Sequence, residues 1–574
     1  MTATTILARR PSLALLGLGL LQAAATVWAL WVSMQFSDDG TCALINAGLF
    51  AVPLLLMLAI SGRWSYAVAF ATLAAILFWA IGEFKLRYFD NRLALLDFSF
   101  LGEGANWSIV GRYPRLQWAL AGFVVACLVL GVHARLARRG PAHGWRVRAA
   151  CLVLLGGWSS FAWANRHHHN WEVFRDDADC GLLKICGVMS RLVYSYSVFE
   201  MPTVLPSGDS SRFEALLSSY RPAPVATSGA KPDVVVWLNE STFDPRGYAI
   251  KGARWPHLKM FDKRPETRAQ GLLRVHTYGG KTWLSEFSVL TGLVPDDFGA
   301  RRTTVFNAVA PHMRDNLVAR FEANGYRTVV LMPTMKRFYG AGRTYESLGF
   351  DRVLTLRDFH EYDQIPGDEW DIADSERLAE AAVTLLKRNA ADTRDPRPLF
   401  LYMLSIHEHA PYPKNTPVIA GLQQAELGKS LKGKLSDYSN KLVKLDRGIG
   451  VLESYLTQQQ RRAVWAYFGD HQAYFEEQQP PYLRQLPKPD FLTQYQVRSN
   501  FRPLDPLAAP PLLDIALLPS LVADVAGLRH DTWFDGLSAM REACAGTLED
   551  CEDAALVTSF KNWTFSPQLA LLAR

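Results

Sequence analysis

Residues 231–242 read KPDVVVWLNEST: a short apolar run follows a proline and ends in four polar residues. An unbroken apolar run that is rich in valine is typical of a strand buried on both faces, as in a parallel sheet. In open α/β sheets, ligands bind beyond the carboxyl ends of the strands. Glu240 stands at that end, so this stretch predicts both an α/β fold and the place where its chemistry begins.

Three further runs of this kind follow along the chain. They are YRTVVLMP (326–333), PLFLYMLSIH (398–407) and AVWAYFGDH (463–471), and helical stretches separate them. Strands that alternate with helices favour a central, mostly parallel sheet. We therefore predict that residues 231–574 form one α/β domain that carries the chemistry of the protein.

The chain that precedes this domain is far more apolar. Five apolar runs each approach the ~20 residues that cross a bilayer, at about 12–33, 42–61, 65–84, 116–134 and 148–164. A cleaved signal peptide would explain the first run alone. We predict a transmembrane domain with five spans over residues 1–165, followed by a connector with interfacial helices over 166–230.

Arginines beside the apolar runs predict how the spans are oriented. Arg9 and Arg10 precede the first run, Arg63 separates the second from the third, and HARLARRGPAHGWRVR (133–148) separates the fourth from the fifth. By the positive-inside rule these places face the cytoplasm, so everything after about residue 170 is extracytoplasmic. The net charge of +6 then reflects topology or anionic lipid, and no nucleic-acid partner is predicted.

The seven cysteines agree with an exported domain. Four of them form two close pairs outside the apolar runs, Cys180 with Cys186 and Cys544 with Cys551. Local pairs of this kind suit disulfides in an oxidising compartment, and four free thiols are the alternative.

Acidic and basic side chains stand at the ends of three of the predicted strands. Glu240 follows the first strand, and His407 and His409 lie in HEHAPY after the third. Asp470 and His471 follow the fourth. Ligand sites of α/β sheets lie at this edge, and carboxylates and imidazoles are ligands of divalent metals. The sequence therefore predicts a metal or acid–base site there.

The segment YGGKTWLSEF (278–287) resembles the end of a nucleotide-binding P-loop, G-x-x-x-x-G-K-[ST]. That template needs a glycine where Val275 stands, so no nucleotide partner is predicted. Apolar residues at i, i+4 and i+7 spacing instead predict a helix that begins near Thr282 and ends at Gly292. A helix N-terminus favours anions, which would put a phosphate beside the hydroxyl of Thr282.

Taken alone, Thr282 is most simply interpreted as a helix cap. A threonine hydroxyl becomes a good nucleophile only when a base or a metal lowers its pKa. Glu240, Asp470 and His471 would hold such a metal, with Thr282 Oγ as the fourth ligand. The four residues together therefore predict a metal site that contains a nucleophile.

These features together resemble the lipoteichoic acid synthase and phosphoglycerol transferase family, which belongs to the alkaline phosphatase/sulfatase superfamily. The resemblance covers essentially the whole chain. It rests on the five spans and on the motifs NES, GGKTWLSEF, HEHAPY and FGDH. LLDIALLPSLVADVAGL (512–528) is also similar to the superfamily's segment after its metal-binding Asp-His. The resemblance implies a sulfatase-like catalytic domain behind a membrane anchor.

The resemblance also implies roles for individual residues. The ligands Glu240, Asp470 and His471 match the family's metal site, and Thr282 matches its nucleophile, which also ligates the metal. His409 matches the histidine that contacts the phosphate. His407, two residues away, is the rival for that role.

Further residues match a substrate-binding stretch of the family. In RFYGAGRTYESLGF (337–350), Tyr339 matches an aromatic residue, but the family's arginine is displaced, so Arg343 or Arg337 would take its place. The segment DEWDIAD (368–374) is similar to another family element near the site. Its Trp370 and Asp371 would line the pocket, and a structural role for these two residues is the alternative. The predicted substrate-binding residues are His407, Arg343, Tyr339, Lys281, Trp370 and Asp371.

The activity that the resemblance implies is a transfer with one divalent metal, Mn²⁺ or Zn²⁺ rather than Mg²⁺. Thr282 would attack the phosphodiester of a phospholipid, and diacylglycerol would leave. A hydroxyl of a glycan or glycolipid acceptor would then take the head group from the threonine. Phosphatidylglycerol is the preferred donor and phosphatidylethanolamine the alternative. The protein would lie in a bacterial cytoplasmic (inner) membrane, with its catalytic domain facing the periplasm.

Two other functional classes are weighed against this one. A membrane-tethered phosphatase, phosphodiesterase or sulfatase-like hydrolase would use water as acceptor, but the C/S-x-P-S-R segment of sulfatases does not occur in the sequence. A non-catalytic membrane scaffold would be expected to lose a metal ligand, and all four are present.

Overall fold

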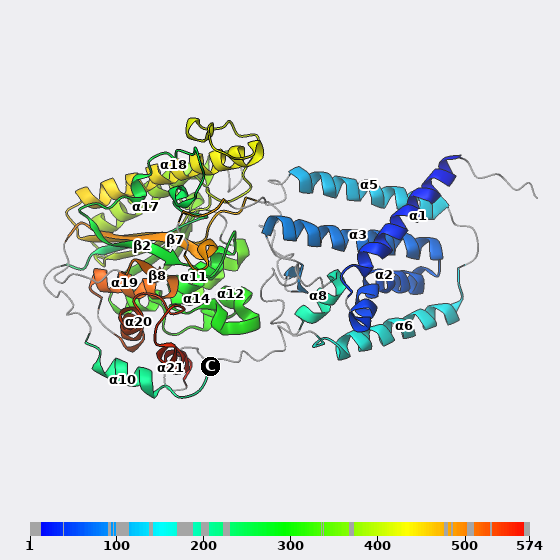
Figure 1. Ribbon diagram of the computed structural model, residues 1–574, viewed down its shortest axis with the longest axis horizontal. Helices are drawn as coiled ribbons and strands as arrows, with labels where there is room; N and C mark the ends of the chain where they lie inside the picture. Colours follow the sequence, from blue (N-terminus) through cyan, green and yellow to red (C-terminus); the bar gives the residue numbers. More distant parts are fainter. Residues whose placement is uncertain are drawn as a thin grey trace, which may run out of the picture. The chain divides into compact units, whose positions relative to one another are not determined.

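The computed structural model describes residues 13–37, 39–89, 93–95, 97–98, 114–136, 142–168, 187–196, 206–221, 230–333, 336, 338–366, 372–475, 480–483, 486–501, 510–528 and 531–566. Two compact units divide the chain, Met1–Pro202 and Thr203–Arg574 (Figure 1).

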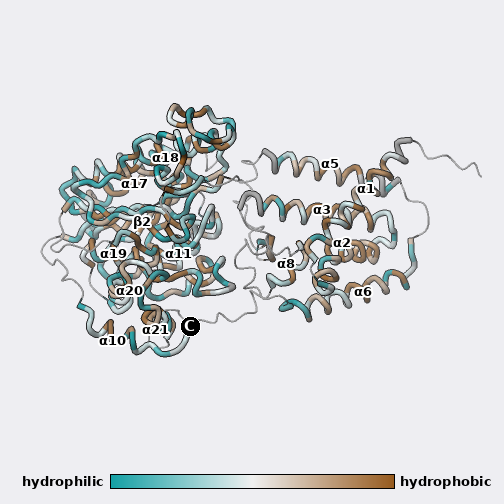
Figure 2. Tube along the Cα trace, in the orientation of Figure 1, coloured by the Kyte–Doolittle hydropathy of each residue, from teal (hydrophilic) through white to brown (hydrophobic). Residues whose placement is uncertain are grey.

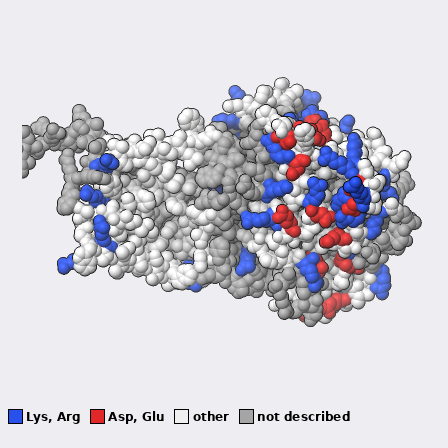
Figure 3. All heavy atoms as spheres, turned by 180° about the vertical axis from the view of Figure 1, so that it is seen from behind, with Lys and Arg blue, Asp and Glu red and all other residues white. Residues whose placement is uncertain are grey.

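The first unit is helical. Its helices are α1 (Leu13–Met34), α2 (Gly40–Ser61), α3 (Trp64–Phe89), α5 (Pro114–Leu136), α6 (Trp145–Ala164) and the short α8 (Val188–Ser195). Hydrophobic residues dominate the long helices (Figure 2). On the face shown in Figure 3, few charged side chains mark this unit, whereas lysines, arginines and acids are interspersed over the second unit. Such a surface suits contact with lipid.

Four of the described helices are long and apolar enough to cross a membrane. These spans are Gly17–Met34, Gly40–Ser61, Trp64–Lys85 and Trp145–Ala164. The sequence predicted five. The remaining long helix, α5, has 23 residues, of which Gln117–Val129 form a shorter apolar segment, so it is not among these four spans. The structure thus confirms the membrane character of this unit and leaves α5 outside the set of clear spans.

Close approach between helices holds the first unit together. Trp158 of α6 lies on Gly48 of α2, where an added Cβ would fall 2.0 Å from the indole ring. Its Nε1 donates to the carbonyl oxygen of Leu44 at 3.0 Å. The hydroxyls of Thr26 and Thr72 join α1 to α3 at 2.9 Å. Small residues and polar contacts of this kind are typical of helices that pack inside a bilayer.

The second unit is built on an eight-stranded sheet with the order β4-β3-β5-β1-β6-β7-β2-β8. Its strands are β1 (Asp233–Asn239), β2 (Thr267–Arg274), β3 (Arg327–Met332), β4 (Arg352–Thr355), β5 (Leu399–Leu404), β6 (Ala463–Gly469), β7 (Leu492–Ser499) and β8 (Leu512–Asp514). The four predicted strands are neighbours and run parallel, as expected. The sheet as a whole is mixed, because β7 runs antiparallel to both β6 and β2.

Helices cover both faces of this sheet (Figure 1). They are α10 (Ser211–Ser219), α11 (Thr282–Thr291), α12 (Val305–Ala308), α13 (Leu317–Ala323), α14 (Ala341–Leu348), α15 (His360–Asp363), α17 (Ser375–Ala391), α18 (Lys429–Gln458), α19 (Leu518–Ala526), α20 (Thr532–Ala543) and α21 (Ala554–Thr564). Alternate residues of β1 point to opposite faces. Val234 and Val236 pack in one apolar core with α11, α14 and α19, and Val235 and Trp237 pack in the other with α17 and α18.

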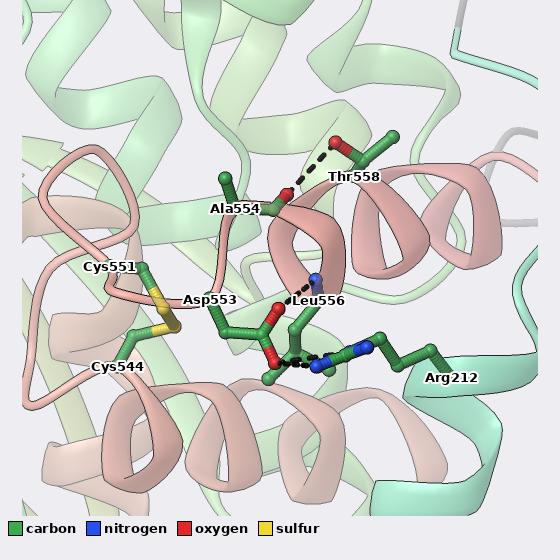
Figure 4. The surroundings of a disulfide bond; sticks show 7 residues. All are labelled: Arg212, Cys544, Cys551, Asp553, Ala554, Leu556 and Thr558. Carbon is green, nitrogen blue, oxygen red and sulfur yellow. Dashed lines mark hydrogen bonds and ion pairs between the residues drawn. A yellow bond between two sulfur atoms is a disulfide. The ribbon is translucent and has the colours of Figure 1, made fainter.

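A disulfide closes the turn between α20 and α21. Cys544 and Cys551 are joined with an S–S distance of 2.04 Å (Figure 4). Just beyond it, Asp553 caps α21 by accepting from Leu556 N at 2.9 Å, and Arg212 Nε of α10 donates to the same carboxylate at 3.0 Å. The other predicted pair, Cys180 and Cys186, lies outside the described residues. The remaining cysteines, Cys42, Cys127 and Cys151, form no disulfide among the described residues and lie in helices of the first unit.

Candidate metal centre

The ends of two adjacent strands bring the first candidate residues together. Strands β1 and β6 are parallel, and Asn239 pairs with Gly469, so Glu240 and Asp470 leave the sheet side by side. Gly469 allows this approach, because a Cβ there would lie 1.9 Å from the carbonyl oxygen of Thr242. The strand register therefore fixes the two carboxylates at one edge of the sheet.

Glu240, Asp470 and His471 form a compact buried cluster. Each offers one ligand atom, and these atoms all lie within 4.8 Å of one another. The Nε2 atom of His471 is 3.4 Å from Glu240 Oε1 and 3.3 Å from Asp470 Oδ2. All three side chains are almost completely buried. Two carboxylates and one imidazole at this spacing are a donor set for a divalent metal.

Thr282 joins this cluster as the first residue of α11. Its Oγ1 donates a hydrogen bond to Glu240 Oε2 at 3.0 Å. The turn before Thr282 requires a glycine: Gly279 has φ of +67°, and a Cβ there would lie 2.8 Å from Tyr474 Cβ. One turn of helix later, Ser285 Oγ donates to the carbonyl oxygen of Asp470 at 2.6 Å. Both ends of the first turn of α11 are thus tied to the strand ends that carry the acids.

The electrostatics of the cluster fit a bound cation. Among the described residues, neither Asp470 Oδ2 nor His471 Nε2 has a hydrogen-bond partner. His471 Nδ1 lies 2.9 Å from the carbonyl oxygen of Gln472, so the proton belongs on Nδ1 and the lone pair of Nε2 faces the carboxylates. Burial, and then the charge of Glu240, raise the pKa of Asp470, whereas burial lowers the pKa of His471. A divalent cation would satisfy both orphaned atoms and offset the crowded negative charge.

A second layer of hydrogen bonds holds the end of β1. Ser405 Oγ accepts from Glu240 N at 3.0 Å and donates to Glu408 Oε2 at 2.7 Å. Ser375 Oγ donates to the other oxygen of Glu408 at 2.6 Å. Burial raises the pKa of Glu408 to about 7. Glu408, which stands between the two histidines of HEHAPY, thus supports Glu240 through Ser405.

The two histidines of HEHAPY face different neighbours. Burial lowers the pKa of His471, and an electrostatic interaction with His409 contributes to that lowering. Lys441 Nζ donates to the carbonyl oxygen of His409 at 2.8 Å. The pKa of Asp374 is lowered, against burial, by the backbone N–H of Glu376 and then by Lys444 and His407. His409 thus interacts with a candidate ligand and His407 with Asp374.

The residues predicted to bind substrate lie in different elements of the second unit. Tyr339 is buried beside α11, and its ring centroid lies 5.9 Å from that of Trp283. Lys281 is the half-buried N-cap of α11 and has φ of +66°. Arg343 is exposed on α14. Arg337, Trp370 and Asp371 lie outside the described residues.

Comparisons with known proteins show the family to which the chain belongs. Residues 232–505 match the sulfatase family. Over 519 residues the chain is 30% identical to an uncharacterized protein of Haemophilus influenzae. The alignment covers 89% of this chain and 92% of that protein. The chain belongs to the sulfatase family, within the alkaline phosphatase superfamily. With its apolar N-terminal helices, it is a membrane-anchored member.

Two solved structures are similar to the chain. One is a phosphoglycerol transferase of Streptococcus pyogenes in complex with sn-glycerol-1-phosphate, with a TM-score of 0.47, 17% identity, and coverage of 64% of this chain and 95% of that chain. The other is the integral membrane lipooligosaccharide phosphoethanolamine transferase of Neisseria meningitidis, with a TM-score of 0.46, 15% identity, and coverage of 92% and 98%. At this level of similarity neither structure assigns a substrate to this chain.

Proposed function

We propose that this protein is a metal-dependent transferase that moves a phospholipid head group to a hydroxyl group through a phosphothreonine at Thr282. One observation carries the proposal: the Thr282 hydroxyl lies 3.0 Å from a carboxylate of a buried cluster with unsatisfied ligand atoms. A threonine held there can be both ligand and nucleophile.

Four residues would hold the metal. Glu240, Asp470 and His471 would supply two oxygens and a nitrogen, and Thr282 Oγ would be the fourth ligand. Such a set suits Mn²⁺ or Zn²⁺ better than Mg²⁺. The bound ion would lower the pKa of the threonine hydroxyl and balance negative charge on the transferring phosphoryl group.

The reaction has two displacements at phosphorus. In the first, Thr282 Oγ passes its proton to Glu240 Oε2, which accepts its hydrogen bond at 3.0 Å, and forms the new bond to phosphorus, while the bond from phosphorus to the diacylglycerol oxygen breaks. His409 is the candidate donor of the proton that this leaving oxygen takes up. In the second, a hydroxyl of a glycan or glycolipid gives its proton to His409 and attacks phosphorus, the bond from phosphorus to Thr282 Oγ breaks, and that oxygen regains its proton from Glu240. The N-terminus of α11 and Lys281 would attract the phosphate.

Parallel incubation with labelled phosphatidylglycerol and labelled phosphatidylethanolamine tests this function. We expect the purified full chain with Mn²⁺ or Zn²⁺ to release diacylglycerol from phosphatidylglycerol at least about tenfold faster, a difference of ~1.4 kcal/mol in barrier. Faster release from phosphatidylethanolamine would instead identify the alternative donor. Release from neither lipid would contradict head-group transfer, and a head group recovered only in free form would indicate a hydrolase.

We also propose that α5 is a fifth span, so that residues 1–165 form the anchor, 166–230 a connector and 231–574 an extracytoplasmic catalytic domain. The 23 residues of α5 would extend about 35 Å, which exceeds the ~30 Å of bilayer hydrocarbon. Its arginines, Arg115 and Arg135, are near its two ends, where a span meets the head groups. Trp118 is 78% exposed, as a side chain that faces lipid would be.

Reporter fusions test this topology in a sharp way. With five spans and a cytoplasmic N-terminus, a fusion after His143 lies in the cytoplasm and a fusion after His168 lies outside. We expect a green fluorescent protein to be fluorescent only at the first position and an alkaline phosphatase reporter to be active only at the second. If α5 does not cross, both results are reversed, because each later segment changes side.

A further inference from the structure

A fully buried acid lies one helical turn beyond the candidate nucleophile. Glu286 of α11 is 0% exposed, and its neighbours in that helix, Leu284 and Phe287, pack in the apolar core. Both of its oxygens are occupied: Oε2 accepts from the Tyr339 hydroxyl at 2.7 Å, and Oε1 accepts from the Tyr345 hydroxyl. Burial raises the pKa of Glu286 to about 7, although the two tyrosines act to lower it. Burying a carboxyl group this deeply costs free energy unless hydrogen-bond partners satisfy its oxygens.

The two tyrosines belong to another part of the fold. Tyr345 lies in α14, and Tyr339 lies in the turn Phe338–Gly340 just before that helix. Tyr339 has φ of +38°, in the left-handed region that non-glycine residues rarely adopt. Such a conformation persists only where the surroundings hold it. Asn307 Nδ2 stabilises this conformation by donating to the carbonyl oxygen of Tyr339 at 3.1 Å. Glu286 stabilises it by accepting a hydrogen bond from the Tyr339 hydroxyl.

This turn adjoins the candidate metal centre. The ring of Tyr339 packs against that of Trp283, the residue that follows Thr282, with centroids 5.9 Å apart. Burial, and then the charges of Glu286 and Asp470, raise the pKa of Tyr402. This tyrosine of β5 therefore interacts electrostatically with both acids. The carboxylate of Glu286 therefore links the helix that presents Thr282 to the turn beside it.

We propose that Glu286 is a positioning residue for the transfer: through Tyr339 and Tyr345 it fixes the turn Phe338–Gly340 as one wall of the space beside Thr282 that receives the lipid head group. Glu286 acts through the two tyrosines, because it is fully buried and each of its oxygens accepts from one of their hydroxyls. This inference rests on the proposed function for its substrate. The link between α11 and the turn is a property of the fold alone.

The substitution Tyr339→Phe tests the link between Tyr339 and Glu286 with little change in side-chain volume. Tyr339→Phe removes the 2.7 Å hydrogen bond and keeps the ring. We expect the KM for the labelled phospholipid to rise about tenfold and kcat to change less than about threefold, because a displaced wall weakens binding of ground state and transition state alike. Tyr326→Phe is the matched control: Tyr326 is buried in the same core, and its hydroxyl has no hydrogen-bond partner among the described residues.

A double-mutant cycle asks whether Tyr339 acts through Glu286. Because contacting residues couple, Tyr339→Phe should raise KM less than about threefold in a Glu286→Gln background. Effects on KM that multiply independently, or a Tyr339→Phe variant with the KM of Tyr326→Phe, would overturn the proposal.

A second readout does not depend on activity. Lys336 is exposed just before the turn, and its carbonyl oxygen accepts from Gly342 N at 2.8 Å. We expect Tyr339→Phe and Glu286→Gln to speed cleavage after Lys336 by a lysine-specific protease at least about fivefold, while Tyr326→Phe leaves it unchanged, since cleavage follows local opening. Unchanged cleavage in both site variants would overturn the positioning role. Faster cleavage in a protein that acts on neither lipid would uphold the link and reject the proposed function alone.

Discussion

Replacing Thr282 with alanine is expected to abolish both diacylglycerol release and covalent labelling of the protein, while the fold remains intact. The hydroxyl oxygen is the atom that bonds to phosphorus in the proposed first step. Loss of a nucleophile that acts with its whole catalytic site costs about 10⁶-fold in kcat in a well-studied hydrolase, so a fall of at least about 10⁴-fold is expected. The structural change is small: one methyl group, and one hydrogen bond to Glu240 at 3.0 Å.

Intact-mass spectrometry after brief exposure to phospholipid measures the intermediate directly. The wild-type chain should gain the mass of one head-group phosphoryl unit, and Thr282→Ala should gain nothing. Thr282→Ser restores a hydroxyl and should restore the adduct, at a lower rate. An adduct on the alanine variant would exclude Thr282 as the nucleophile. Thr291→Ala, at the far end of the same helix, controls for effects on α11 itself, because Thr291 Oγ1 donates to Phe287 O at 2.6 Å and accepts from Leu293 N at 3.2 Å.

The central part of the sheet and its site follow from sequence because they rest on local signals. Strands β1 and β6 are unbroken apolar runs, and each is followed at once by the residues that meet at the sheet edge. Once two such strands are parallel neighbours, Glu240 and Asp470 have to be close. The hydrogen bond from Thr282 to Glu240 was predictable only as proximity at a helix start, because the turn before α11 depends on tertiary contacts such as Gly279 against Tyr474.

The edge of the sheet carries no such signal. Strand β7 reads LTQYQVRS and β2 reads TRAQGLLR, so polar side chains interrupt both, and β8 has three residues. These strands are defined by pairing with one another and not by apolar runs, which is why the antiparallel β7 was not anticipated.

The acids Glu286 and Glu408 show a second limit of sequence reasoning. Glu286 lies within GGKTWLSEF and Glu408 within HEHAPY, and burial raises the pKa of both to about 7. Nothing local distinguishes them from ligands. Their partners, Tyr339 and Tyr345 for one and Ser375 and Ser405 for the other, come from distant segments that only the folded chain assembles.

Replacing Asp470 with asparagine should have opposite effects on the metal-free and metal-loaded protein. Asp470 Oδ1 accepts from Ser241 N and His471 N, both at 2.7 Å, and an asparagine oxygen can accept both. The amide would replace Oδ2, which has no hydrogen-bond partner among the described residues, and would remove a buried charge that repels Glu240. We therefore expect the metal-free variant to melt at the wild-type temperature or above it. With Mn²⁺ or Zn²⁺ at about 100 times the wild-type Kd, wild type should gain about 2.7 kcal/mol and the variant nothing, because a ligand stabilises only a site that binds it.

The control for this experiment is a buried aspartate at the other end of β1. Asp233 bonds to Arg461 at 2.9 and 3.0 Å and accepts from Leu399 N at 2.8 Å, away from the strand end that carries Glu240. Asp233→Asn removes the charge of an ion pair, so the metal-free protein should melt at a lower temperature while its gain from added metal stays that of wild type. Thermal unfolding of the three proteins with and without metal, together with measurement of bound metal, separates the two cases. A metal-dependent shift that survives in Asp470→Asn would remove Asp470 from the ligand set, and with it the proposed activation of Thr282.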